Sequence, residues 1–107
     1  GNLYARDGDI TLDASGRLTV NNSLATGAVT AKGQGVTLTG DHKAGGNLSV
    51  SSRSDIVLSN GTLNSDKDLS LTAGGRITQQ NEKLTAGRDV TLAAKNITAR
   101  LTRPAIS

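Results

Sequence analysis

Asp9-Ile-Thr-Leu12 is the stretch that decides the fold, because the chain repeats it in similar form four more times. The later copies are Ala28-Val-Thr-Ala31, Asn47-Leu-Ser-Val50, Asp68-Leu-Ser-Leu71 and Asp89-Val-Thr-Leu92. Their first residues are separated by 19, 19, 21 and 21 positions. Repetition with a period of about twenty residues is typical of a solenoid. Within each copy, apolar residues alternate with polar or small ones, the pattern of a half-buried strand.

Two further apolar columns follow the first in each repeat. The second column consists of the pairs Leu18/Val20, Val36/Leu38, Ile56/Leu58, Ile77/Gln79 and Ile97/Ala99. The third and weaker column holds Leu24, Leu63 and Leu84, with Ala44 as the candidate in the second coil, Leu101 or Pro104 in the last, and Leu3 in a preceding coil. Three strands per repeat predict an all-β parallel β-helix of about five coils of 19–21 residues. Aliphatic side chains then point inward and Thr and Ser outward.

The residues between these columns favour sharp corners. Ala14-Ser-Gly16, Lys32-Gly-Gln-Gly35 and Ala73-Gly-Gly75 separate the first strand from the second, and Asn and Gly follow the second strand. Gly and Asn accept the positive φ that tight bends require. Asn or Gln side chains at similar heights could also form hydrogen-bonded ladders from coil to coil. With coils about 4.8 Å apart, the five form a rod about 24 Å long.

Composition leaves two structural alternatives. Only 35% of the residues are hydrophobic, and Tyr4 is the single aromatic. The many Gly, Ser, Thr, Asn and Asp residues are compatible with disorder, but the strict alternation favours an ordered chain. Short strands with turn signals also suit a β-sandwich, which gives no reason for five similar repeats. We therefore expect residues 1–107 to form one β-helical segment, cut from a longer repeat array, with an irregular end at residues 102–107, where Pro104 cannot donate to a ladder.

Candidate catalytic and metal-binding groups are sparse. His42 is the only histidine and lies in Asp41-His-Lys43, which we interpret as an exposed turn. The nine carboxylates form no cluster with His or Arg, so we expect no enzyme, although some β-helix enzymes do cleave polysaccharides with paired acids. Gly45-Gly46 and Gly74-Gly75 lack the following residues of a calcium-binding repeat. One His and no Cys exclude a transition-metal site in practice, and the sequence indicates no cofactor.

Three segments carry a family resemblance. Residues 83–99 (Lys83-Leu-Thr-Ala-Gly-Arg-Asp-Val-Thr-Leu-Ala-Ala-Lys-Asn-Ile-Thr-Ala99) resemble the haemagglutinin repeats of filamentous haemagglutinin and related exoproteins. So do Asp68-Leu-Ser-Leu-Thr-Ala-Gly-Gly-Arg-Ile77 and Asp9-Ile-Thr-Leu-Asp-Ala-Ser-Gly-Arg-Leu18. The similarity covers about residues 3–101. It specifies the class of repeat and no particular protein.

The resemblance implies a large bacterial exoprotein that is exported by two-partner secretion, with an outer-membrane partner. Such proteins form long right-handed β-helical fibres on the cell surface. Some are adhesins for host-cell receptors or sulfated glycans, and others are stalks that carry a toxin in contact-dependent growth inhibition. We expect an adhesive surface segment, with a passive toxin stalk as the alternative. No apolar run is long enough to span a membrane.

Charge suggests one candidate binding surface. The chain has a net charge of +3, and cations predominate from Arg76 onward. The candidate glycan-binding residues are Arg76, Lys83, Arg88, Lys95, Arg100 and Arg103. Such a stripe could attract sulfated polysaccharide or anionic lipid headgroups, or simply maintain solubility. Nucleic acid is not an expected partner, because stacking aromatics are missing. Asp68 and Asp89 are expected to stack one coil apart, with Lys67 and Arg88 offsetting their repulsion.

Overall fold

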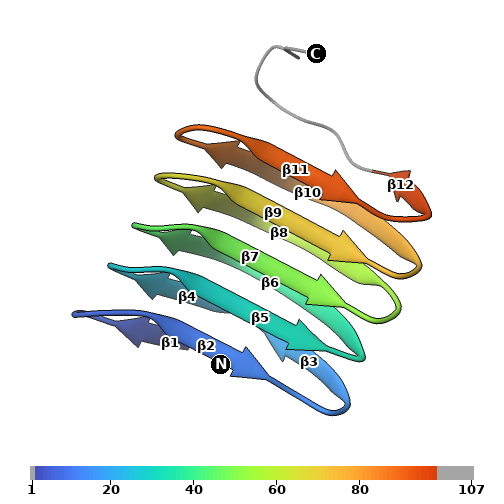
Figure 1. The fold of residues 1–107 in the computed structure, drawn as a ribbon, viewed down its shortest axis with the longest axis horizontal. Coiled ribbons are helices and arrows are strands. Elements are labelled where there is room, and N and C mark those ends of the chain that lie inside the picture. The colour runs from blue at the N-terminus through green and yellow to red at the C-terminus, as the bar shows by residue number, and fades with distance from the viewer. Residues whose placement is uncertain (1, 99–107) are drawn as a thin grey trace.

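The computed structural model describes residues 2–98 and builds them from strands alone. All strand pairs are parallel, and they form two sheets that wrap around one core. In Figure 1 the front strands run from left to right, the chain returns behind them, and it climbs toward the C-terminus. This sense of winding is right-handed. The predicted parallel β-helix of about five coils is therefore confirmed.

One sheet contributes a single strand to every coil. Its strands are β2 (Ile10–Asp13), β5 (Val29–Gly33), β7 (Leu48–Ser52), β9 (Leu69–Ala73) and β11 (Val90–Ala93). They hydrogen-bond in the order β11-β9-β7-β5-β2. The five recurring tetrapeptides thus lie directly above one another, with Ile10 opposite Val29 and Leu48 opposite Leu69. We call this the five-stranded sheet.

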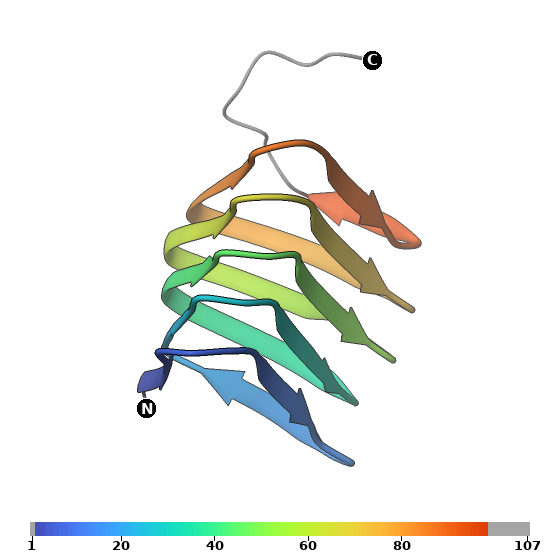
Figure 2. The ribbon, with the colours of Figure 1, turned by 60° about the vertical axis from the view of Figure 1, so that its left-hand side comes forward.

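The other sheet has seven strands and covers two faces of the coil. Its strands are β1 (Asn2–Ala5), β3 (Arg17–Val20), β4 (Asn22–Ala25), β6 (Gly35–Ala44), β8 (Ile56–Ser65), β10 (Arg76–Ala86) and β12 (Asn96–Thr98). The first half of β6 pairs with β3 and its second half with β4. The long strands β6, β8 and β10 therefore combine the second and third predicted strands of their coils, and Figure 2 shows the stacked coils from the side.

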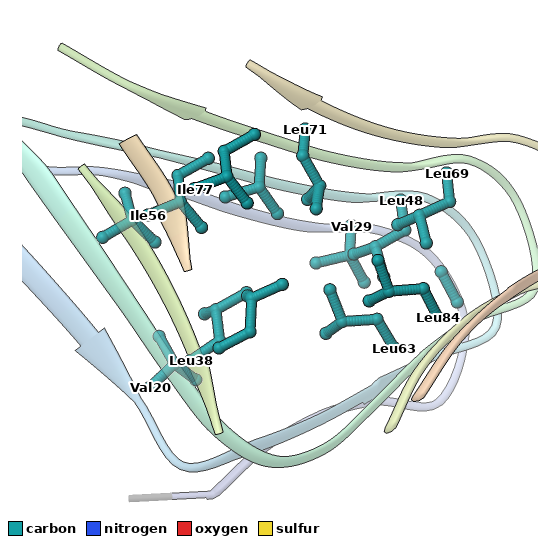
Figure 3. Packing of buried hydrophobic residues seen from close by; sticks show 14 of the residues in the cluster. Val20, Val29, Leu38, Leu48, Ile56, Leu63, Leu69, Leu71, Ile77 and Leu84 are labelled. Atoms are coloured by element: carbon teal, nitrogen blue, oxygen red, sulfur yellow. The ribbon is translucent and has the colours of Figure 1, made fainter. Parts of the chain in front are cut away.

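The interior consists of stacked aliphatic side chains. Ile56, Leu58, Leu63, Leu69, Leu71, Ile77 and Leu84 are fully buried. Figure 3 shows Leu63 and Leu84 on one wall, pointing toward Val29, Leu48 and Leu69 on the opposite wall. Burying a Leu or Ile side chain contributes about 1.5–3 kcal/mol. Because each layer repeats the one below, small aliphatics fill a narrow core without the large aromatics that a globular domain uses.

The first two predicted columns are confirmed in register. Leu18 lies opposite Val36, Val36 opposite Ile56, and Ile56 opposite Ile77. Gln79 takes the place of Leu58 in the next coil, as expected, and its side-chain amide donates to the backbone carbonyl of Glu82. Ala99, Leu101 and Pro104, together with the proposed irregular end at 102–107, lie outside the described residues.

The third column is correct for Leu3, Leu63 and Leu84 and wrong for Leu24 and Ala44. In the second coil His42, and not Ala44, lies opposite Leu63. Leu63 and Leu84 are paired inside, and Leu3 belongs to the same column because it lies opposite Ser23. Leu24, however, points outward and is 45% exposed, since Ser23 and Ala25 on either side of it are the inward residues. The alternation of a strand makes it impossible for Leu24 to share their side. Ala44 is buried, in line with Ala25 below it.

The corner inside the seven-stranded sheet depends on a left-handed backbone. Gly40, Asn60 and Asn81 have φ values of 77°, 58° and 53° at equivalent positions of three successive coils. Asn tolerates this conformation better than other side chains do, and the amide nitrogen of Asn81 donates to Oδ1 of Asn60 at 3.3 Å. A Cβ atom on the neighbouring Gly61 would lie 2.0 Å from the Gly40 carbonyl oxygen. One rung of the predicted amide ladder is therefore present at this corner, and it ends at Gly40, which has no side chain.

Candidate binding surface

His42 is buried, so its interpretation as an exposed turn residue was wrong. It is 2% exposed and lies in β6, between Ser23 in the coil below and Leu63 in the coil above. Its Nδ1 atom is 2.8 Å from Ser23 Oγ, and its Nε2 atom is 2.9 Å from the Thr39 carbonyl oxygen. These two contacts satisfy the ring, with Nε2–H donating to the carbonyl and Ser23 donating to Nδ1.

This serine–histidine pair does not form an accessible catalytic site. A nucleophile must reach its substrate, whereas Ser23 is only 5% exposed and His42 only 2%. Burial lowers the pKa of His42, although the Thr39 carbonyl and the Asp41 charge act in the opposite direction. Burial therefore favours the neutral imidazole at this position, which lies in a column of mostly apolar side chains.

Glu82 is a second ionisable group that sequence reasoning did not single out. It is 7% exposed, and neither of its carboxylate oxygens has a hydrogen-bond partner. Burial, and then the charge of Asp41, raise its pKa to about 7. The residue lies in β10 opposite Gly61, directly after the left-handed corner. The described residues contain no group of three His, Cys, Asp or Glu side chains that could hold a metal ion.

The predicted glycan-binding cations lie at three different places around the coil. Arg76 and Lys95 share the corner that follows the five-stranded sheet, because Arg76 pairs with Asn96. Lys83 projects from the second half of β10, on another face. Arg88 lies at the corner before β11, where its Nη2 atom is 3.1 Å from Asp68 Oδ2. The remaining two candidates, Arg100 and Arg103, lie outside the described residues.

Instead, the fold places one cation from each coil around a single corner, at different register positions: Lys32 lies opposite Asp13, whereas Arg17 lies opposite Gly35. We call Arg17, Lys32, Arg53, Arg76 and Lys95 the basic ridge, and all five side chains are exposed. They lie where the chain leaves the five-stranded sheet: Lys32 is near the end of β5, and Arg53 and Lys95 follow β7 and β11. Arg17 and Arg76 are the first residues of β3 and β10. Backbone hydrogen bonds stack these corners, for example from Arg53 N to Gly33 O at 3.1 Å and from Lys95 N to Gly75 O at 3.0 Å.

At the corner where the chain enters the five-stranded sheet, the first, fourth and fifth coils carry carboxylates, whereas the second and third coils have only uncharged residues there. We call Asp7, Asp9, Asp66, Asp68 and Asp89 the acidic ridge. Several of these side chains accept a backbone N–H from the next coil: Asp9 Oδ1 from Ala28 at 2.8 Å and Asp68 Oδ1 from Asp89 at 3.3 Å. The predicted stacking of Asp68 below Asp89 and the offsetting role of Arg88 are confirmed by these contacts and by the Arg88–Asp68 ion pair.

Two shallow hollows mark the edges of the five-stranded sheet. One, of about 280 Å³, is lined by Lys32, Arg53 and Asp13 together with Ser51 and Ser52. The other, of about 270 Å³, is lined by Asp68, Asp89 and Asn47 together with Ser49, Ser70 and Thr91. Both hollows present charged groups and hydroxyls to the outside. They can hold charged or hydroxyl-bearing groups, and neither contains an arranged nucleophile and base.

A parallel solenoid built from repeats, with charged side chains along its outer corners, places the chain in the class of β-solenoid repeat proteins. The family described as repeats of unknown function (DUF5649) matches residues 7–64 and 45–104, and the chain belongs to it. Among the described residues, no helix is long and apolar enough to cross a membrane. No solved structure matches the chain.

Three similar proteins share the name CdiA. The "16S rRNA endonuclease CdiA" of Enterobacter cloacae is 46% identical over 66 residues, which is 62% of this chain. The "Toxin CdiA" of Escherichia coli is 48% identical over 67 residues (63% of this chain), and the "tRNA nuclease CdiA" of Yersinia mollaretii is 46% identical over 63 (59%). The aligned part spans 2% of each relative. The resemblance to haemagglutinin-type repeats of two-partner-secretion exoproteins is confirmed.

Proposed function

We propose that this chain is a stiff stalk segment of a secreted, surface-exposed exoprotein that carries a toxin at a distance from its own cell. The unbroken parallel ladder is the observation that supports this role most directly. Each described coil is hydrogen-bonded to its neighbours on all faces and again at the corners. A solenoid built this way lengthens by about 4.8 Å per coil, and its stability adds along the repeats.

The names of the similar proteins, and the small part of each that matches this chain, support the same proposal. Their names describe toxins and nucleases, while the part that matches this chain is 2% of their length. A segment this small, with no exposed catalytic arrangement among its described residues, suits a spacer better than the nuclease itself. Export through an outer-membrane secretion partner and display on the bacterial surface belong to this proposal. The segment needs no cofactor and no catalysis for it.

The test is a comparison of two changes in the full-length exoprotein. Deleting residues 48–68 removes one whole coil and joins Asn47 to Leu69, the residue that pairs with Leu48. The matched variant replaces the same 21 residues with a flexible Gly/Ser linker. A stalk tolerates the shorter rod and keeps delivering its toxin, whereas the flexible break reduces delivery. Equal delivery by both variants, or its loss on the coil deletion despite normal surface display, would contradict the proposal.

Adhesion to sulfated glycans is the second candidate, and the basic ridge is the observation that favours it. Five exposed cations occur in five successive coils, so a linear polyanion lying along the rod could contact several of them at once. Surface charges of this kind act over about 10 Å at 0.1 M salt. Host-cell receptors or glycans of this chemistry would then be partners of the exoprotein.

Heparin chromatography separates the two candidates. Adhesion predicts salt-sensitive retention that decreases when Arg76 and Lys95 are both changed to Gln. The matched control is the pair Lys83→Gln and Arg88→Gln, which removes the same charge away from the ridge. If retention depends on the ridge, adhesion is supported. If the chain is not retained at low salt, or if both double variants lose retention equally, the adhesive proposal fails and the stalk proposal stands unaffected.

A further inference from the structure

The outer face of the five-stranded sheet has opposite charge at its two edges. The basic ridge lies at or beyond the ends of its strands, and the acidic ridge precedes their beginnings. Figure 1 shows these strands running across the front of the molecule, so the two ridges lie at opposite sides of this face. The corner with the basic ridge also holds Asp13 and Asp55, which leaves it a net +3. The corner with the acidic ridge also holds Arg6, Lys67 and Arg88, which leaves it a net −2.

Between the ridges, the face carries one uncharged column in every coil. The column consists of Thr11, Thr30, Ser49, Ser70 and Thr91, paired in register from coil to coil. The cationic hollow beside Lys32 and Arg53 and the anionic hollow beside Asp68 and Asp89 lie on opposite sides of this column. The two hollows lie at different heights along the rod: the cationic hollow spans the first three coils and the anionic hollow the last three, so they lie diagonally across the neutral column.

We propose that this face pairs with the same face of a second copy of the chain, with the two rods parallel. A two-fold axis that runs along the rods places each basic ridge opposite the partner's acidic ridge. Arg53 and Arg76 of one copy can then enter the hollow that Asp68 and Asp89 of the other copy line. A two-fold axis across the rods gives antiparallel pairing, which places like charges opposite each other and is disfavoured.

The small area of this face means that only long rods can pair stably through it. Five strands of four or five residues present a face of about 24 Å by about 15 Å, or roughly 350 Å². Stable complexes bury about 800 Å² per partner. One segment of this size therefore associates weakly. Consecutive segments of the same array add their contacts through effective concentration, and fibres that project from one surface are already parallel.

Cysteine trapping distinguishes the two orientations, because the chain contains no cysteine of its own. In the parallel pair, Thr11 of the first coil meets Thr11 of the partner. In the antiparallel pair, Thr11 meets Thr91 of the fifth coil. We expect Thr11→Cys to form disulfide-linked dimers under mild oxidation at low salt, and to form few when the same oxidation is carried out at 1 M salt, where the screening length is about 3 Å. The matched control, Lys43→Cys, places an exposed thiol on another face.

Charge reversal provides the second arm. The double variant Arg53→Glu with Arg76→Glu makes both edges acidic, and Asp66→Lys with Asp89→Lys makes both edges basic. In the Thr11→Cys background, each double variant alone is expected to lose the dimer, and a mixture of the two is expected to restore it as a heterodimer. Circular dichroism verifies that each variant remains folded.

Three outcomes would overturn the proposal. Preferential cross-linking of Thr11→Cys to Thr91→Cys in a mixture would show antiparallel pairing. Dimer yields no greater than those of Lys43→Cys would show that the face is not an interface. Heparin fragments that bind the isolated chain through the basic ridge, with no restored heterodimer in the mixed variants, would assign the ridge to a polyanion instead of a second copy.

Discussion

His42 occupies a place that Leu63 takes in the next coil, and its polarity is satisfied by one contact from the coil below and one from its own strand. Ser23 and Leu84 lie in the same column, 19 residues before it and 42 residues after it. Only Ser23 and the Thr39 carbonyl make the ring acceptable there. Sequence patterns treat histidine and serine as surface residues, so this part of the third column could not be predicted.

The buried imidazole makes stability depend on pH. Because burial lowers its pKa in the folded state, His42 binds its proton more readily when the chain is unfolded. Its contribution is therefore complete above its ordinary pKa of 6.5 and is lost as the pH falls below that value. We expect the thermal midpoint to fall between pH 7 and pH 5, and to fall less in His42→Leu.

Both chains in that comparison carry Glu82→Gln, so that Glu82, the other group with a shifted pKa, does not contribute to the pH dependence. Ser23→Ala is the control, since it keeps the imidazole buried and should retain the pH dependence. Asp41 is the charged group whose field acts on His42, so Asp41→Asn is expected to move the transition to lower pH. Identical pH profiles for His42 and His42→Leu would contradict the buried neutral ring.

Glu82 makes stability depend on pH in the opposite direction. Its pKa rises from an ordinary value of 4.5 to about 7 on folding, so the folded chain holds the proton more tightly. The resulting stability is complete below pH 4.5 and is lost as the pH rises toward 7. Glu82→Gln should match the original chain at pH 4 and exceed it at pH 8. We expect a gain of several degrees, because about 1 kcal/mol shifts the midpoint of such a domain by about 4–8 °C.

An exposed carboxylate provides the comparison for that measurement. Asp66 lies at a corner, and its side chain is exposed, so Asp66→Asn should change the midpoint little at either pH. A Glu82→Gln chain that is less stable than the original at pH 8 would mean that the carboxylate has a partner there.

At the scale of strands, alternation was predictable because it is local. Each recurring tetrapeptide has two inward residues and one hydroxyl residue between them, and the structure pairs all five copies in register. The second column followed for the same reason. The merging of the second and third strands into β6, β8 and β10 was not visible, because Asn60 and Asn81 bend the backbone without ending the ladder.

Leu71 and Ser70 in β9 provide a matched test of the two faces. Leu71 is fully buried, whereas Ser70 points outward beside Leu69. Leu71→Asp removes aliphatic packing and buries an unpaired charge, so we expect it to destabilise the fold by roughly 4 kcal/mol or more. Ser70→Asp should cost less than about 1 kcal/mol, because its side chain stays in water.

Urea unfolding followed by circular dichroism measures both variants against the unchanged chain. Similar midpoints for Leu71→Asp and Ser70→Asp would mean that the strand presents its faces in the opposite sense. A large effect of Ser70→Asp alone would instead indicate that the outer face of β9 is covered. The pairing proposed above predicts such cover only at concentrations at which the chain associates.

For the molecule as a whole, the basic ridge is a feature that the sequence predicted only in part. The cations of the basic ridge occur at positions 17, 32, 53, 76 and 95, with unequal spacings, because they take different register positions around the corner. Only Arg76 and Lys95 were among the predicted site residues. The stacking of the coils, which depends on the register of all the strands, is what gathers Arg17, Lys32 and Arg53 at the same corner as these two residues.

Hydrogen exchange should reveal how the stability is distributed along the rod. Within the described residues, β7 has hydrogen-bonded neighbours on both sides, whereas β2 and β11 have a neighbour on one side only. Strands with an open edge exchange their amides through local opening. We therefore expect the amides of Leu48–Ser52 to be protected most, and those of Ile10–Asp13 and Val90–Ala93 to exchange faster by at least an order of magnitude at low concentration. End-to-end association should slow exchange in the outer strands as the concentration rises, while lateral pairing should leave their open edges unprotected. Uniform protection across all five strands at every concentration would contradict the additive, coil-by-coil stability on which the stalk proposal depends.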